Sequence, residues 1–159
     1  MRIMEMNKYP YLIRLVKKTD DRGNLVFAEG NGNIPFEIRR VYYIYGANEK
    51  TVRGGHAHKE SDIVLISVAG SCTVKLIAPG GCVSEYVLSS PCNGLYVPAC
   101  YWREMYDFSA DCVLLSLSST HYSESDYIRD FSDFSDADKK IPVSFYERNI
   151  TEQTRPSLL

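Results

Sequence analysis

The 159-residue sequence contains no apolar run approaching the ~20 residues that span a membrane. Residues 1–18 also lack the uninterrupted apolar stretch of a secretory signal peptide. Positive charge is not in excess either, because 18 Lys and Arg residues stand against 20 Asp and Glu residues. We therefore expect a cytoplasmic protein with no membrane or nucleic-acid partner, in which local arginines hold any anionic ligand.

The cysteines lack the pattern of a disulfide framework or of a structural zinc site. Their number is odd and no two of them form a CxxC pair. We expect free, half-buried thiols. The five positions are Cys72, Cys82, Cys92, Cys100 and Cys112.

Helical periodicity is absent between residues 11 and 117, where short β-branched and aromatic runs are separated by Gly, Pro and Asn. This pattern predicts an all-β sandwich or barrel. With 45% hydrophobic residues, the chain suits one domain around one core, with the barrel over about residues 10–118. The expected strands cover residues 11–16, 25–29, 36–45, 63–68, 72–77, 83–88, 94–97, 102–108 and 112–118.

One short helix is expected after the barrel, over about residues 124–134. Ser123 and Asp126 resemble a capping box, and Tyr127, Phe131 and Phe134 then fall on one helical face. Residues 147–159 are expected to form a loose tail.

A pair of histidines, His56 and His58, carries the clearest chemical signal. Side chains two residues apart in an extended strand point to the same side, so both imidazoles would share one pocket. The spacing of the HxH pair, three further residues, the acid Asp62 and then Gly70 matches the first motif of the cupin barrels, although Glu is usual at the acid. The sequence therefore predicts a cupin-type jelly-roll β-barrel with one short C-terminal helix.

Arg103 argues against a metal in this pocket. Metal-binding cupins add a histidine in a second motif, PxGxxH, and Arg103 occupies that histidine's position. A guanidinium does not coordinate a cation, so we expect no metal and no other cofactor. An imidazole has an ordinary pKa of about 6.5, and we interpret the pair as the acid and base of a proton-transfer enzyme.

The strand expected over residues 36–45 adds a binding surface, because Arg40 and Tyr42 lie on one face of it. A guanidinium and a phenol together are typical of a site for a charged, flat ligand. Trp102 either lines the mouth of the pocket or fills the core, and His121 is expected at the surface.

These residues resemble the nucleotide-sugar 3,4-ketoisomerases that act on dTDP-4-keto-6-deoxy-D-glucose. The resemblance extends over about residues 18–134 and consists of many short blocks in one order. The blocks are residues 21–25, 34–36, 40–44, 53–59, 70–72, 94–96, 102–104, 107–109 and 126–129.

The resemblance implies a metal-free homodimer with exchanged N-terminal strands, acting in the synthesis of 3-acetamido-3,6-dideoxyhexoses for surface polysaccharides such as O-antigen lipopolysaccharide. It implies that His56 moves the proton between C-3 and C-4 through an enediolate, supported by His58 and Tyr42. The residues it implies for holding the nucleotide sugar are Arg22, Gly23, Arg40, Arg53, Trp102 and Arg103, with Tyr42 also contacting the ligand.

This chain differs from the usual family pattern at two places near the histidines. It has Asp62-Ile63 where Glu-Gln is usual, and Arg103 where histidine is usual. The Arg22-Gly23 pair resembles the branch with a galacto product, because glycine leaves room that a bulky side chain would take from the hexose. The expected product is dTDP-3-keto-6-deoxy-D-galactose.

Three other interpretations stay open. The histidines could satisfy buried hydrogen bonds without any catalytic role. A metal-dependent cupin oxygenase or isomerase would use His56, His58 and Asp62. A non-catalytic cupin would bind a nucleotide sugar and leave its C-3 proton unexchanged.

Overall fold

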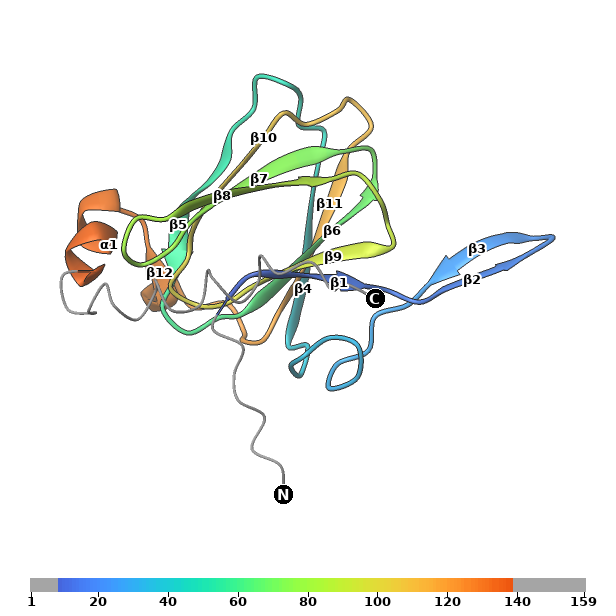
Figure 1. Ribbon diagram of the computed structural model, residues 1–159, viewed down its shortest axis with the longest axis horizontal. Helices are drawn as coiled ribbons and strands as arrows, with labels where there is room; N and C mark the ends of the chain where they lie inside the picture. Colours follow the sequence, from blue (N-terminus) through green and yellow to red (C-terminus); the bar gives the residue numbers. More distant parts are fainter. Residues whose placement is uncertain (1–8, 139–159) are drawn as a thin grey trace, which may run out of the picture.

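The computed structural model describes residues 9–138, and that part of the chain consists mainly of β-strands (Figure 1). The strands are β1 (Tyr11–Arg14), β2 (Lys17–Asp20), β3 (Gly23–Val26), β4 (Arg40–Tyr45), β5 (Arg53–His58), β6 (Ile63–Ala69), β7 (Cys72–Ile77), β8 (Val83–Leu88), β9 (Asn93–Val97), β10 (Trp102–Tyr106), β11 (Val113–Ser118) and β12 (Tyr127–Ile128). A 3₁₀ turn, η1 (Glu124–Asp126), and one helix, α1 (Phe131–Asp138), lie at the C-terminal end of the described residues.

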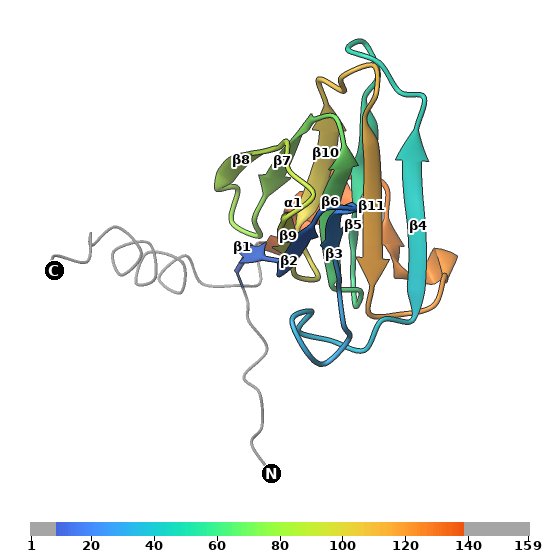
Figure 2. The ribbon, with the colours of Figure 1, turned by 90° about the vertical axis from the view of Figure 1, so that its right-hand side faces the viewer.

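Two five-stranded antiparallel sheets form the body of the molecule. One sheet has the order β1-β9-β6-β11-β4 and the other the order β12-β5-β10-β7-β8. Figure 2 shows β7, β8 and β10 on one side of the barrel, with β4 and β11 on the other. The all-β prediction is confirmed.

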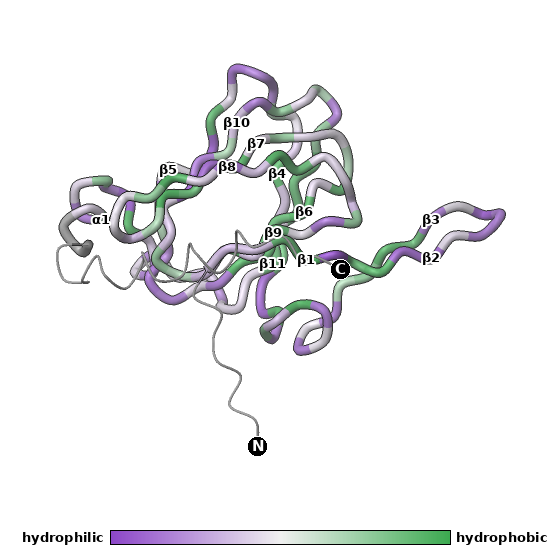
Figure 3. The backbone as a smooth tube through the Cα atoms, in the orientation of Figure 1, coloured by the Kyte–Doolittle hydropathy of each residue, from purple (hydrophilic) through white to green (hydrophobic). Residues whose placement is uncertain are grey.

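Strand periodicity decides which residues fill the space between the sheets. On β7, Cys72, Val74 and Leu76 are buried while the residues between them are half-exposed. On β6 every residue from Ile63 to Ser67 is buried, because a second cluster covers the outer face of that sheet. Figure 3 shows hydrophobic residues gathered where β6, β9 and β11 run together. The second cluster contains Ile13, Leu15, Ile34, Phe36, Val64, Ile66, Tyr96 and Leu117.

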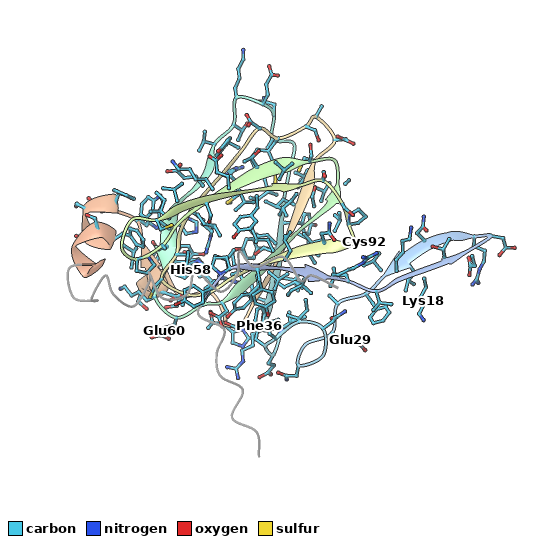
Figure 4. The ribbon with its side chains drawn as sticks, viewed as in Figure 1. Lys18, Glu29, Phe36, His58, Glu60 and Cys92 are labelled. Atoms are coloured by element: carbon cyan, nitrogen blue, oxygen red, sulfur yellow. The ribbon has the colours of Figure 1, made fainter. Side chains whose placement is uncertain are left out.

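Strands β2 and β3 form a separate hairpin that extends away from the barrel (Figure 1). All of its residues are exposed except Val26, which is half-buried. Figure 4 labels Lys18 on this hairpin, away from the barrel. The expected strand over 11–16 is wrong at its end, because β1 ends at Arg14 and, two residues after the buried Leu15, the exposed hairpin begins at Lys17.

Three further strand predictions are wrong in their bounds. The strand expected over 102–108 ends at Tyr106, because Asp107 has a positive φ of 51°. The strand expected over 25–29 ends at Val26, because the Asn33 side chain bonds the next backbone groups: its Oδ1 accepts from the Glu29 N–H and its Nδ2 donates to the Phe27 carbonyl. The strand expected over 36–45 begins only at Arg40. The Phe36 carbonyl is held in a loop, where it accepts from the Asn31 N–H at 3.0 Å.

The helix expected over 124–134 is wrong in its first half. Residues 124–126 make one 3₁₀ turn, and Ser123 makes no side-chain capping bond. Tyr127 and Ile128 then pair with β5, opposite His58 and Ala57, so backbone pairing to an edge strand replaces the first helical turns. Helix α1 begins at Phe131. The tail expected over 147–159 lies outside the described residues.

Within residues 9–138, no helix combines the length and the apolar character that crossing a membrane requires.

Candidate active site

Two glycines shape the strand that carries the histidines. Gly54 and Gly55 have positive φ angles of 89° and 66°, and the pairing of β5 with β10 shifts register between Arg103 and Glu104. A Cβ on Gly54 would lie 2.5 Å from the Arg103 carbonyl oxygen, so only glycine fits. The resulting bulge brings β5 close to β10 directly before His56.

The two imidazoles lie side by side, as the HxH spacing predicts. Their ring centroids are 5.3 Å apart with an interplanar angle of 22°. His58 is buried inside the barrel, where Figure 4 labels it, while His56 is partly accessible.

Arg103 joins both histidines through one nitrogen. Its Nη2 lies 2.9 Å from Nε2 of His56 and 2.7 Å from Nε2 of His58. A guanidinium only donates, so Nε2 of His56 accepts and this ring carries its proton on Nδ1. This proton is donated to the Gly54 carbonyl at 3.1 Å. Both ring nitrogens of His58 face the same Nη2, with Nδ1 at 3.2 Å. Each imidazole therefore accepts from Arg103, which requires a neutral ring.

Burial and charge reinforce this neutral state. Burial first, and the Arg103 cation second, lower the pKa of His56 to about 4. The same two causes, in the same order, lower the pKa of His58 to about 2. At neutral pH both rings are unprotonated, so His56 is available as a base. The 3.9 Å approach of His58 Nδ1 to Asp126 is consequently not an ion pair.

Strand β12 closes the site from the C-terminal side. The Tyr127 ring meets His58 edge-on at 4.5 Å and tilts against His56 at 5.0 Å. Asp126 anchors the segment, because Oδ1 accepts from the Glu60 N–H at 2.7 Å and Oδ2 accepts from the Ser61 hydroxyl at 2.5 Å. The chain is thus held to the segment 126–128 both at Ala57 and His58, which pair with β12, and at Glu60, which bonds Asp126.

A cavity of about 360 Å³ opens between the two sheets beside His56. Its wall combines apolar side chains, two phenols and three guanidiniums, a composition suited to a polar ligand with charged groups. The lining residues are Tyr42, Ile44, Val52, Arg53, Gly54, His56, Leu65, Arg103, Met105, Leu114, Ser116, Tyr127 and Arg129.

Several residues predicted from the sequence meet at this cavity. His56, Arg53, Tyr42 and Arg103 line it. His58 lies directly behind Arg103, at the 2.7 Å contact already described.

Arg40 lies on the same face of β4 as Tyr42, with its guanidinium 5.2 Å from the Tyr42 ring centroid and 5.6 Å from that of Tyr122. It sits beside the cavity without lining it.

Other predicted site residues lie elsewhere in the chain. Trp102 is buried against Ala57 and Phe134 in the core under α1, and it does not line this cavity. Arg22 and Gly23 are on the β2–β3 hairpin, where Arg22 pairs with Asp20 at 2.5 Å, and they do not line their own chain's cavity. Ile63 is buried in the core and does not line the cavity. His121 is exposed.

The ligand set of the metal-dependent interpretation is not assembled. Asp62 accepts a hydrogen bond from the Ala99 N–H at 2.9 Å, away from the cavity wall. Across residues 9–138, no group of three His, Cys, Asp or Glu side chains is placed to hold a metal ion.

Sequence reasoning missed three polar side chains of the cavity wall: Ser116, Tyr127 and Arg129. Tyr127 and Arg129 belong to a block that carries the family resemblance, but their assignment to a helix concealed their role. Arg129 is held by Glu124 through bonds of 2.6 and 3.0 Å, and its guanidinium lies 4.4 Å from the Tyr127 ring centroid. The signal for Ser116 was its place in an otherwise apolar strand.

The fold and the site together define a cupin-type barrel with two neutral histidines and a buried arginine at its cavity. Comparison with known proteins agrees with this class. Residues 8–139 match the family described as "FdtA: WxcM-like, C-terminal". The chain belongs to this family, and the resemblance to sugar 3,4-ketoisomerases is confirmed.

Named relatives are similar to this chain over most of their own length. The TDP-4-oxo-6-deoxy-alpha-D-glucose-3,4-oxoisomerase of Aneurinibacillus thermoaerophilus is 47% identical over 77% of this chain and 88% of that protein. A 3,4-ketoisomerase from Helicobacter canadensis superposes with a TM-score of 0.80 at 39% identity, covering 84% of this chain and 100% of the other.

A third relative carries a ligand. The QdtA 3,4-ketoisomerase from Thermoanaerobacterium thermosaccharolyticum, solved as a histidine-to-asparagine mutant with TDP-4-keto-6-deoxyglucose, superposes with a TM-score of 0.82 at 39% identity. The match covers 87% of this chain and 99% of that one. These similarities confirm the predicted cupin-type barrel.

Proposed function

We propose that this protein converts dTDP-4-keto-6-deoxy-D-glucose to a dTDP-3-keto-6-deoxyhexose by proton transfer through His56. The observation that carries the proposal is the neutral His56 ring on the cavity wall, with its Nε2 lone pair turned toward the Arg103 guanidinium. A base must be unprotonated to accept a proton, and the lowered pKa of His56 keeps it so at neutral pH.

The reaction redistributes protons without any net oxidation. His56 takes the C-3 hydrogen as a proton, and the electron pair left behind forms a C-3 to C-4 double bond with negative charge on O-4. The proton on O-3 passes to O-4, and the His56 imidazolium returns its proton to C-4. Because the pKa of His56 is low, its imidazolium is a strong enough acid to make this return readily.

Arg103 is placed to stabilise the charge that develops on the sugar. Its guanidinium is buried and, among residues 9–138, forms no ion pair with a carboxylate. When substrate enters, we expect one Nη2 proton to turn from His56 Nε2 to the enediolate oxygen. This exchange frees the base and supplies a buried cation where negative charge appears.

The remaining guanidiniums suit the diphosphate. Arg53 and Arg129 are exposed residues on the cavity wall, and Arg40 lies beside it. Guanidiniums bind phosphate oxygens through paired hydrogen bonds, and the Tyr42 and Tyr127 rings offer surfaces on which a base or sugar packs.

The protein is further proposed to be a homodimer with exchanged N-terminal segments. The β2–β3 hairpin projects from the barrel (Figure 1). The edge strand β4 exposes Val41, Tyr43 and Tyr45 at 57%, 62% and 70%. Such a row of apolar side chains on an edge strand is typical of a covered surface.

Exchange of this kind would place Arg22 and Gly23 at a second subunit's cavity, where they would influence the pose of the hexose. The galacto product, dTDP-3-keto-6-deoxy-D-galactose, is proposed on that basis. Its 3-keto group suits a following aminotransferase on the way to the 3-acetamido sugars of surface polysaccharides.

One NMR experiment tests the substrate and the chemistry together. The protein is incubated with dTDP-4-keto-6-deoxyglucose in D₂O, and the sugar protons are followed over time. We expect loss of the C-3 proton signal and a 3-keto product, with deuterium at C-4 in the fraction of turnovers in which the His56 imidazolium exchanges its proton with solvent before returning it. Tight binding without C-3 exchange would instead identify a non-catalytic nucleotide-sugar-binding protein.

A further inference from the structure

The floor of the cavity contains one buried hydroxyl that has no hydrogen-bond partner. Ser116 is 1% exposed, and its Oγ makes no hydrogen bond to any described residue. The alternation of β11 turns Ser116 and Leu114 toward the cavity, whereas Leu115 and Leu117 pack in the outer cluster.

Other buried serines in the same sheet are satisfied. Ser67 on β6 donates to the carbonyls of Ala69 and Gly70 at 2.9 and 3.0 Å. Ser118, two residues beyond Ser116, donates to the Thr120 carbonyl at 3.3 Å. An unpaired buried hydroxyl is costly, so the exception at Ser116 indicates a partner that arrives with a ligand.

The surroundings of Ser116 limit which part of a ligand reaches it. Leu65, Leu114 and Met105 line the same inner region of the cavity, while the exposed Arg53 and Arg129 offer charge nearer the solvent. A diphosphate matches the two exposed arginines, which can bind its oxygens through paired hydrogen bonds. A neutral sugar oxygen matches a lone hydroxyl among apolar side chains, which also suit the methyl group of a 6-deoxyhexose.

We propose that Ser116 Oγ is a substrate-binding group that hydrogen-bonds an oxygen of the hexose ring and helps to select the sugar. This inference rests on the proposed function, because it assumes a nucleotide-linked hexose in the cavity. Ser116 and His56 lie on opposite sheets, so the bond would hold the ring against the base.

Isothermal titration with two probes tests the inference without relying on turnover. The probes are TDP and TDP-6-deoxy-D-glucose, which has no keto group and therefore no acidic C-3 proton. Ser116→Ala is expected to weaken binding of TDP-6-deoxy-D-glucose about 3- to 10-fold, the loss of one net hydrogen bond, and to leave TDP binding unchanged. The kcat/KM for the keto substrate should fall by a similar factor.

Ser67→Ala is the matched control, because it removes a buried hydroxyl from the same sheet outside the cavity. It should lower the Tm and leave both affinities unchanged. Ser116→Ala should leave the Tm of the free protein unchanged or raised, since the lost hydroxyl had no partner. Ser116→Cys, which keeps the size of the side chain, should weaken sugar binding in the same direction.

Equal losses for TDP and TDP-6-deoxy-D-glucose, no loss for either, or a Tm lowered as in Ser67→Ala would overturn the inference. The inference would also be overturned if the wild-type protein bound TDP-6-deoxy-D-glucose no more tightly than TDP. If the wild type binds the probe and fails to isomerise the keto sugar, the proposed reaction is wrong, while the two affinities still decide the role of Ser116.

Discussion

Acidification is expected to destabilise the folded protein through His56 and His58. Their pKa values in the folded state are about 4 and about 2, against about 6.5 for an exposed imidazole. Between pH 7.5 and pH 5 the unfolded chain therefore takes up protons that the folded chain does not. Stability is full above pH 6.5 and falls as the pH drops toward the folded-state values.

The size of this effect follows from the two shifts. At pH 5 each histidine lowers the free energy of unfolding by about 2 kcal/mol relative to pH 7.5, and both together by roughly 4 kcal/mol. This is a large fraction of the ~5–15 kcal/mol typical of a folded domain. Glu124 does not contribute to the change between pH 7.5 and pH 5. The hydrogen bond from Arg129 lowers its pKa to about 2, so its stabilising contribution is lost only below about pH 4.5.

Urea denaturation at pH 7.5, 6.5, 5.5 and 5.0, followed by circular dichroism, measures this dependence. The chain has three histidines, so His56→Asn should remove about half of the decline. His121→Asn, at an exposed position, is the control and should leave the decline unchanged. A wild-type stability that is constant or greater at pH 5 would refute the conclusion that both rings are buried in the neutral form.

Three further predictions concern catalysis. His56→Asn should lower turnover by roughly 10²- to 10⁴-fold with a much smaller effect on nucleotide-sugar binding, as measured by NMR turnover and calorimetry; near-normal turnover would assign the ring a structural role. Turnover should survive exhaustive treatment with EDTA, and a loss that a divalent metal restores would instead favour the metal-dependent interpretation. Arg103→Met should lower kcat by roughly 10²-fold. It should also raise the pKa of His56 in a pH–rate profile, because the Arg103 charge contributes to the lowering of that pKa. Arg39→Met, at an exposed ion pair, is the control and should change neither kcat nor the pKa of His56.

Strand periodicity and turn residues were enough to predict most of the barrel. The alternation of β7 and the mainly apolar run of β6 are each typical of a strand, and both strands agree with the predicted bounds within a residue. The predicted end of the strand over 25–29 was wrong because a side chain replaces the backbone partner there. Asn33 makes the hydrogen bonds to the Glu29 N–H and the Phe27 carbonyl. A local pattern cannot show that competition.

The candidate site was predicted only in part for a related reason. The HxH spacing alone predicts two adjacent imidazole rings. The second cupin motif predicts that Arg103, at the position of the third metal ligand, lies beside them. The places of Tyr127 and Ser116 depend on pairing between distant segments: β12 with β5, and β11 with β4. The burial of Trp102 likewise depends on a distant segment, because α1 packs against it through Phe134.

The short strand β12 has a consequence for the local stability of the site. Only two residue pairs join it to β5, and its anchoring contacts link segments 66 residues apart, as between Lys59 Nζ and the Ser125 carbonyl at 2.8 Å. A segment held by so few bonds opens at a lower free energy than the central strands. The amides of Tyr127 and Ile128 should therefore exchange with deuterated solvent well before those of β6. Because Tyr127 covers both imidazoles, mild denaturant should abolish the arrangement around His58 while the barrel itself is still folded.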